Sequence, residues 1–189
     1  MSAAHPNKDR ERFNQWAETY DRSLMQWLFF ERVHRGVLRR LPRSFNPTGI
    51  ADIGCGTGRL LRRMHTRWPQ AALLGVDPSD GMVSQAQLLT PFATFHQASA
   101  EQLPVEDDSI DLVTSTISFH HWNDQAQGIR EISRVLRSGG LFTLADVNIS
   151  HGHPLSRAQL RSLFVGSNLS IYSQTNLVPF LAITIGKKS

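Results

Sequence analysis

The chain has 189 residues, 40% of them hydrophobic and 19% charged, a composition that excludes a disordered or fibrous protein and fits about one globular domain. Its one cysteine, Cys55, excludes an intrachain disulfide and favours a reducing compartment, so we expect a cytoplasmic protein. The first ten residues lack the apolar stretch of a signal peptide, and no run approaches the roughly 18 apolar residues of a membrane span.

The net charge of +4 is unevenly distributed. Residues 1–67 carry thirteen Lys or Arg against six Asp or Glu, whereas residues 68–189 carry seven against ten. A basic N-terminal third attracts anionic substrates, nucleic acid or anionic membranes. We favour the simpler interpretation that these charges form the solvated face of one helix. The arginines concerned are Arg32, Arg35, Arg39, Arg40 and Arg43.

The N-terminal segment predicts two helices. Residues 9–20 have apolar side chains at the i, i+3, i+4 and i+7 spacing of a helical stripe. Ser23 is placed to cap a second helix that runs to Leu41, and Pro42 ends it. The stripe of the first helix consists of Phe13, Trp16, Ala17 and Tyr20.

From Gly49 the pattern changes to strands that alternate with helices. Parallel strands need crossover connections, and helices of these lengths supply them, so the alternation predicts a doubly wound α/β sheet. Asn123 is the expected cap of the last crossover helix, and Gly139 follows its end. We expect strands at residues 49–54, 71–77, 93–98, 109–116 and 141–146, and helices at residues 57–68, 78–89 and 123–138.

The C-terminal segment differs from this alternation. After a helix at residues 156–165 come two β-rich runs, residues 169–176 and 177–186, with no helix between them. They are expected to pair as an antiparallel hairpin at one edge of the sheet. The prediction is therefore a Rossmann-like, mostly parallel seven-stranded sheet with helices on both faces, in one domain over residues 1–189.

A glycine loop, ADIGCGTG, follows the first strand at residues 51–58. Its glycines permit a tight turn and the close approach of a ligand to bare backbone. The spacing is G-x-G-x-G, with Leu61 where a dinucleotide fingerprint would have its third glycine after Gly58. No G-K-[ST] follows, which excludes a P-loop.

Asp77 ends the second strand, nineteen residues after Gly58. A carboxylate at that point of an open α/β sheet accepts the hydroxyls of a ribose. The structural alternative is that Asp77 caps the helix that follows, but Ser79 is better placed for that role. The loop and the acid together predict a nucleoside-containing ligand.

Five segments in order resemble the class I methyltransferases that depend on S-adenosylmethionine, in particular the small-molecule group that includes ubiquinone and menaquinone biosynthesis methyltransferases. They are DIGCGTG, GVDPSDGMV, ASAEQLPVEDDSIDLV, FHHW and REISRVLRSGG, and the resemblance covers roughly residues 13–146. It implies a helical lid over residues 1–45, a cofactor-binding core over 49–146, and a helix with the hairpin over 147–189.

The resemblance also implies roles for individual residues. Tyr20 closes over the cofactor, and Asp52 lies near its amino group. Asp77 takes the ribose, and Ser99 stands where the family usually has the aspartate that contacts the adenine amino group. The backbone of the loop passes under the methionine part. The remaining cofactor-binding residues are Gly54, Gly56, Gly58, Pro78, Met82, Ala100, Glu101 and Thr116.

Methyl transfer from a sulfonium is an in-line displacement, and a base is needed only when the acceptor is protonated. His120 and His121, after the fourth strand, are the candidates, with no choice between them. Packing and hydrogen bonding within the loop is the alternative for both. Asp146, at the end of the fifth strand, is assigned equally to substrate contact or to helix capping.

The remaining predictions concern partners and competing functions. A small-molecule acceptor is expected rather than nucleic acid, because Cys55 lies inside the glycine loop and the N-P-P-aromatic signature of base-amine methylation is absent. The sequence leaves open whether the chain forms a homodimer. His151 and His153 have no third ligand at a recognisable spacing, so no metal is expected. The alternatives are a non-catalytic protein that binds S-adenosylmethionine or S-adenosylhomocysteine, and a nicotinamide-dependent oxidoreductase.

Overall fold

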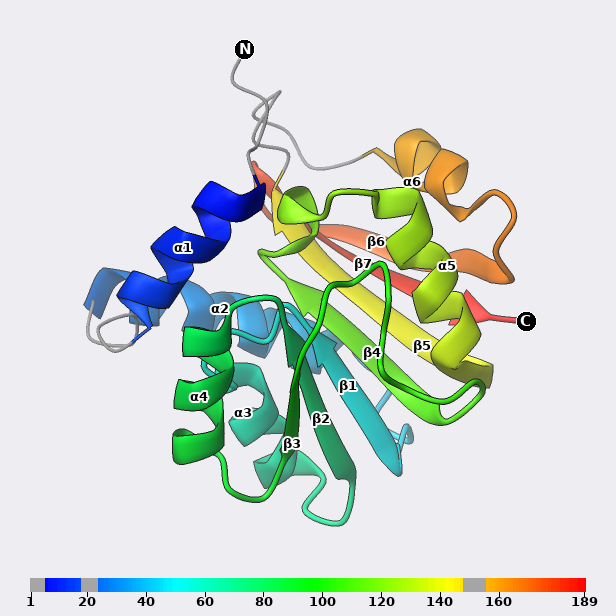
Figure 1. Ribbon diagram of the computed structural model, residues 1–189. Helices are drawn as coiled ribbons and strands as arrows, with labels where there is room; N and C mark the ends of the chain where they lie inside the picture. The colour runs from blue at the N-terminus through cyan, green and yellow to red at the C-terminus, as the bar shows by residue number, and fades with distance from the viewer. Residues whose placement is uncertain (1–5, 18–23, 148–155) are drawn as a thin grey trace.

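The computed structural model describes residues 6–17, 24–147 and 156–189. Its centre is one seven-stranded sheet in the order β3-β2-β1-β4-β5-β7-β6 (Figure 1). The first five strands pair in parallel, and β7 pairs antiparallel with both β5 and β6. The predicted Rossmann-like sheet with a C-terminal hairpin is confirmed. The strands are β1 Gly49–Ile53, β2 Ala72–Asp77, β3 Thr94–Gln97, β4 Ile110–Thr116, β5 Leu136–Val147, β6 Leu169–Val178 and β7 Leu181–Lys188.

Helices cover both faces of the sheet. On one face α5 and α6 pack on the strands, and on the other face lie α2, α3 and α4. All five residues of β1 are buried, since the strand has a neighbour on each side and helices on both faces. The helices are α1 Pro6–Trp16, α2 Leu24–Arg40, α3 Arg59–Arg67, α4 Asp80–Leu89, α5 Gln125–Val135 and α6 Arg157–Phe164, with a short 3₁₀ helix η2 at Phe119–His121.

The last crossover helix differs from its prediction at both ends. Asp124, not Asn123, is the N-cap of α5, and its side chain accepts the N–H of Gln127 at 2.9 Å. The helix ends at Val135 because Leu136 takes an extended conformation and pairs with Ile110 in the sheet. Pairing of the strand therefore outweighs the helical propensity of the residues that follow Val135.

The hairpin turns later than predicted. β6 continues through Val178, and the turn falls at Pro179 and Phe180. Proline has no N–H to donate to a ladder, so its position at the turn leaves the pairing intact. Ser79 caps α4 as expected, its hydroxyl oxygen accepting the N–H of Met82 at 3.1 Å.

Helix α1 packs against the beginning of α4, away from the main body of the sheet (Figure 1). Asn14 makes the polar contacts of this packing, because its side-chain oxygen accepts both the hydroxyl of Ser79 and the N–H of Gly81. A Cβ on Gly81 would lie 3.0 Å from the Asn14 backbone, so the approach of the two helices depends on glycine at that position.

Several predictions fall on segments outside the described residues. They are the Tyr20 lid contact, the Ser23 cap and the loop that contains His151 and His153. Among the described residues, no helix has the length and apolar character needed to cross a membrane.

Candidate functional site

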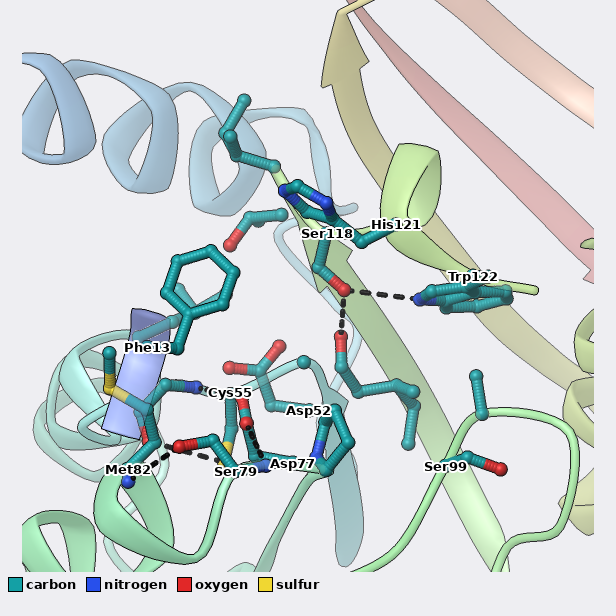
Figure 2. A pocket seen from close by; sticks show the side chains of 18 of the residues that line it. Phe13, Asp52, Cys55, Asp77, Ser79, Met82, Ser99, Ser118, His121 and Trp122 are labelled. Atoms are coloured by element: carbon teal, nitrogen blue, oxygen red, sulfur yellow. Dashed lines mark hydrogen bonds between the residues drawn. The ribbon is translucent and has the colours of Figure 1, made fainter. Parts of the chain in front are cut away.

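A cavity of about 280 Å³ opens where the carboxyl ends of β1, β2 and β4 meet. Figure 2 shows its acidic side chains and, on the β4 side, Ser118, His121 and Trp122. Parallel strands of an open α/β sheet bring their carboxyl ends to one edge, which is where ligands bind in this class of fold. The chain segments that form the walls lie far apart in sequence: α1, α2, the glycine loop, the starts of α3 and α4, and the residues after β3 and β4.

The glycine loop forms the floor of the cavity. Gly54, Gly56 and Gly58 all have positive φ, at 72°, 54° and 76°. A Cβ on Gly54 would lie 1.9 Å from the hydroxyl oxygen of Ser118, so no other residue fits there without moving the chain. Gly56 has nothing within 4 Å of its Cβ position, which leaves the backbone open to a ligand.

Two buried carboxylates, Asp52 and Asp77, border the cavity at the ends of β1 and β2. Burial raises the pKa of Asp52 to about 7; the Thr114 hydroxyl, donating at 2.7 Å, opposes the rise and Asp77 adds to it. Burial also raises the pKa of Asp77 to about 6, against the hydrogen bonds that Ser79 and Gly56 donate. Both groups therefore stand to gain from a ligand that supplies positive charge or hydrogen-bond donors.

Asp77 combines two tasks. One carboxylate oxygen accepts the N–H of Gly56 at 2.9 Å and the other accepts the N–H of Ser79 at 2.9 Å. The first bond fixes the glycine loop, and the second supports the turn into α4. Each carboxylate oxygen has more than one lone pair, so both can still accept a ligand hydroxyl.

Strained backbone follows β4. Ile117 has a φ of 53°, an outlier for a β-branched side chain that costs on the order of 1–3 kcal/mol. Its N–H donates to the carbonyl of Ala145 at 2.8 Å, which holds the turn in place. The turn places the Ser118 hydroxyl over Gly54, where it donates to the Ile53 carbonyl at 3.3 Å and accepts the indole N–H of Trp122 at 3.1 Å (Figure 2).

The two adjacent histidines occupy different environments. His121 borders the cavity and contacts the ring of Phe13 edge-on, at 5.5 Å between centroids. His120 does not border it; its Nδ1 lies 2.7 Å from a carboxylate oxygen of Asp146, whose other oxygen accepts the His120 N–H at 3.1 Å. The two imidazole rings lie 4.0 Å apart. Asp146 is thus an anchor for His120, which neither predicted role for that residue described.

Most of the predicted site residues line one cavity. His120 and Gly58 stand outside its wall, Gly58 serving as the N-cap of α3, and Tyr20 lies outside the described residues. The residues that do border it are Asp52, Gly54, Gly56, Asp77, Pro78, Met82, Ser99, Ala100, Glu101, Thr116 and His121.

Sequence reasoning missed one wall of the cavity. Phe30 and His34 reach it from α2, and Arg59 reaches it from the start of α3. Helical periodicity indicates which residues of α2 share a face but not what that face covers, so no pattern in the sequence distinguished these side chains from core residues. The spacing of Phe30 and His34, four residues apart, is the signal that places both on the same wall.

Glu101 contacts the loop before α5. One of its carboxylate oxygens accepts the N–H groups of Asn123 and Asp124, at 2.8 and 3.1 Å. Glu101 and Asn123 border the cavity, as do the neighbouring Ser99 and Ala100.

The cavity suits S-adenosylmethionine by chemistry as well as by position. An ammonium group and vicinal hydroxyls are the partners that buried carboxylates accept, and the open backbone at Gly56 admits a flexible chain. Among the described residues, no three His, Cys, Asp or Glu side chains gather in a way that would hold a metal ion.

Comparison with known proteins agrees with this geometry. Residues 51–144 match the Methyltransferase domain family. The chain is 33% identical over 162 residues to a malonyl-[acyl-carrier protein] O-methyltransferase of Dechloromonas aromatica, covering 83% of this chain and 58% of the relative. It is 30% identical over 149 residues to a ubiquinone/menaquinone biosynthesis C-methyltransferase of Campylobacter jejuni, covering 72% and 62%. The chain thus spans about three fifths of the length of these curated relatives.

A solved structure shares the fold over nearly the whole chain. It is the methyltransferase in a complex with the Trm112 methyltransferase activator of Haloferax volcanii, with a TM-score of 0.77 at 21% identity, covering 93% of this chain and 97% of that one. The order of motifs, the sheet topology and the matched family together give one conclusion. The chain belongs to the class I, Rossmann-like methyltransferases that depend on S-adenosylmethionine.

Proposed function

We propose that the protein transfers the methyl group of S-adenosylmethionine to a small-molecule acceptor by in-line displacement. The observation that carries the proposal is one cavity that joins an open glycine loop, two buried carboxylates at strand ends and an imidazole on the opposite wall. The family supports the reaction class, and the site supports how this chain performs it.

The cofactor site is assigned to the β1–β3 half of the cavity. Asp52 accepts the amino group of the methionine part, and Asp77 accepts the ribose hydroxyls with the lone pairs that Gly56 and Ser79 leave unused. Pro78 and Met82, next to Asp77 along the chain, pack on the adenine.

The adenine edge is assigned to the residues after β3. Ser99 offers a hydroxyl in place of the aspartate usual in the family, so it accepts a hydrogen bond without adding charge. The Ala100 N–H serves the ring. Because a neutral acceptor makes a weaker hydrogen bond than a carboxylate, we expect this end of the site to contribute less to affinity than Asp77 does.

The bound cofactor supplies the electrophilic methyl carbon, and the protein orients the acceptor and excludes water. Phe13, from α1, closes the cavity over the acceptor side and lies against His121. Excluding water strengthens each polar interaction in the site and keeps a deprotonated acceptor bare.

His121 is the residue that we assign as general base, because it is the member of the histidine pair that borders the cavity. His120 is a positioning residue. Asp146 fixes its ring and backbone, and its ring packs against that of His121. An acidic anchor on one imidazole thereby orients the other.

The acceptor is proposed to be a small molecule with an apolar or aromatic part. The wall on the acceptor side consists of Phe13, Phe30, Ile117 and Trp122, all from this chain. The N-terminal helices α1 and α2 supply two of these side chains. The curated relatives carry the names of an O- and a C-methyltransferase, and the accepting atom is left to experiment.

The first test is calorimetric titration with S-adenosylmethionine, S-adenosylhomocysteine and NAD. We expect micromolar binding of the two sulfur nucleosides, none of NAD, and a loss of at least about 100-fold for Asp77→Ala, which removes both ribose bonds. Asp80→Ala is the matched control, an exposed acid three residues away that does not border the cavity. Binding of NAD, or of nothing, would overturn the proposal.

The second test separates catalysis from binding. Wild type and His121→Phe are incubated with S-adenosylmethionine and a panel of carboxylic acids, phenols and quinols, and the formation of S-adenosylhomocysteine is measured. For a protonated acceptor, His121→Phe should lower kcat by about 10²–10⁴-fold with unchanged cofactor affinity. Cofactor binding with no turnover on any acceptor class would favour the non-catalytic alternative.

A further inference from the structure

His34, on α2, is a buried polar side chain that the proposed roles leave unused. It is 3% exposed, and its Nδ1 has no hydrogen-bond partner among the residues that the structure describes. A buried polar atom without a partner costs about 1–3 kcal/mol. The ring borders the cavity, so a ligand can supply the partner that the folded chain does not.

The surroundings of His34 are basic. Burial and, to a lesser extent, the positive charges of Arg59 and Arg62 together lower its pKa to about 3, so the imidazole is neutral at physiological pH. Arg59 also borders the cavity, its guanidinium 5.9 Å from the centroid of the Phe30 ring. The Phe30 ring lies 5.8 Å from that of His34, so one wall carries all three side chains.

The N-terminus of α3 adds to this positive potential. The helix has nine residues, and its N-cap, Gly58, has no side chain to accept the first N–H groups. The positive end of the helix dipole favours a negative charge nearby. Arg59 and Leu60, the first two residues of the helix, both border the cavity.

The cavity is therefore polarised. Asp52 and Asp77 lie at the strand ends, and a neutral histidine, an arginine and a helix N-terminus lie on the side of α2 and α3. An anion placed against the second group satisfies His34 without leaving a buried charge uncompensated. A planar carboxylate is the common anion that accepts hydrogen bonds from an imidazole and from backbone N–H groups together.

We propose that His34 donates a hydrogen bond to a ligand carboxylate in this cavity, in the positive field of Arg59, Arg62 and the N-terminus of α3. This inference rests on the proposed function and deepens it. The carboxylate has two sources, the amino-acid part of the cofactor and an acidic acceptor, and both present the same chemistry to His34.

One experiment distinguishes the sources. Calorimetry compares S-adenosylhomocysteine with S-adenosyl-3-thiopropylamine, which lacks only the carboxylate, on wild type and on His34→Phe. If the cofactor is the source, His34→Phe weakens binding of S-adenosylhomocysteine by about 10–100-fold and leaves the affinity of the analogue unchanged. If the acceptor is the source, each nucleoside binds to His34→Phe as tightly as it binds to the wild type. Malonate then binds to the wild type saturated with S-adenosylhomocysteine but not to the variant.

Two further variants keep the result interpretable. His34→Gln retains a donor and should recover part of the lost affinity. His65→Phe changes a histidine of α3 that stacks on Phe92 outside the cavity wall, and it should change none of the affinities. Because phenylalanine removes the unpartnered nitrogen, we expect the Tm of His34→Phe to equal or exceed that of the wild type, which shows that the variant folds.

The outcomes separate the inference from the function on which it rests. Equal affinities of wild type and His34→Phe for S-adenosylhomocysteine, the decarboxylated analogue and malonate would make His34 a packing residue and overturn the inference alone. A wild type that binds neither nucleoside would overturn the proposed function, and the inference with it.

Discussion

The two halves of the cavity are built in different ways. The cofactor half takes its polar groups from one continuous stretch of chain, residues 52–100, in which the glycine loop, Asp77 and Ser99 follow one another. The acceptor half brings together α1, α2 and the segment after β4, which are separated by about a hundred residues. Local sequence thus defines the first half, and packing of distant segments defines the second.

The two halves are also destabilised for different physical reasons. In the cofactor half, burial keeps two carboxylates at raised pKa, a cost that a bound ammonium and ribose offset. In the acceptor half, the cost is backbone strain at Ile117, which hydrogen bonds of the surrounding loop over-determine.

The largest effect is expected where the halves touch. In Gly54→Ala the new methyl group would meet the Ser118 hydroxyl at 1.9 Å, and the residue must keep a φ of 72°. We expect a loss of about 2–4 kcal/mol in the free energy of unfolding and no measurable binding of S-adenosylhomocysteine. Denaturant unfolding and calorimetry check both.

Gly139→Ala is the matched control for this change. Gly139 has a similar φ of 80°, but nothing lies within 4 Å of its Cβ position and it is outside the cavity wall. It should lose only the cost of a left-handed alanine, about 1–2 kcal/mol, and bind as the wild type does. Equal losses in the two variants would show that contact with Ser118 contributes nothing.

Asp52→Asn separates stability from binding in the cofactor half. Because the folded-state pKa of about 7 lies above the ordinary value of 3.8, Asp52 stabilises the fold below pH 4, and this contribution is lost as the pH rises through 7. Asparagine does not ionise, so Asp52→Asn does not bury a charge as the pH rises. At pH 8 the variant should therefore be more stable than the wild type by on the order of 1–3 kcal/mol. Near pH 4 the two should be equal.

Binding should respond in the opposite direction. The amide no longer offers a negative charge to the ammonium group, so the affinity of Asp52→Asn for S-adenosylhomocysteine should fall by about tenfold or more. In the wild type, affinity should rise between pH 6 and pH 8, because the ligand requires the ionised acid. Urea unfolding at pH 4.5 and pH 8, with calorimetry across this range, measures both effects; a variant less stable than wild type at pH 8 would contradict the assignment.

Asp146→Asn tests whether the anchor of the acceptor half matters to catalysis. An amide in place of the carboxylate weakens the bond to His120 Nδ1, and His121 loses the neighbour that orients it. With an acceptor that supports turnover, kcat should fall about 10–100-fold, less than for His121→Phe, while cofactor affinity stays within about twofold. A fall in cofactor affinity of the same size would indicate structural damage instead.

The smallest effect is expected at helix α1. Asn14→Ala removes the acceptor for the Ser79 hydroxyl and the Gly81 N–H, and so loosens α1 over the cavity. We expect cofactor affinity to fall about threefold to tenfold, mainly through a faster dissociation rate. Stopped-flow dissociation measures this, with the exposed neighbour Gln15→Ala as control. Unchanged dissociation would mean that α1 does not retain the ligand.

The sequence by itself determined the cofactor half and the sheet. Strand and helix periodicities, the G-x-G-x-G spacing and the acid after the second strand are local signals, because each depends on residues close together in the chain. The mostly parallel, doubly wound sheet follows from strands that alternate with helices, and the hairpin follows from two β-rich runs with no helix between them.

Tertiary structure decided the rest. Ending α5 at Val135 required the pairing of Leu136 with Ile110, which no helix propensity predicts. The different environments of His120 and His121 depend on Asp146 and on the cavity wall, and finding His34 required knowing that one face of α2 borders the cavity while another packs on the core. Each of these depends on contacts between segments that are distant in the sequence. The role of a side chain in such a contact is set by the residues that pack against it, and its neighbours in the sequence do not specify those residues.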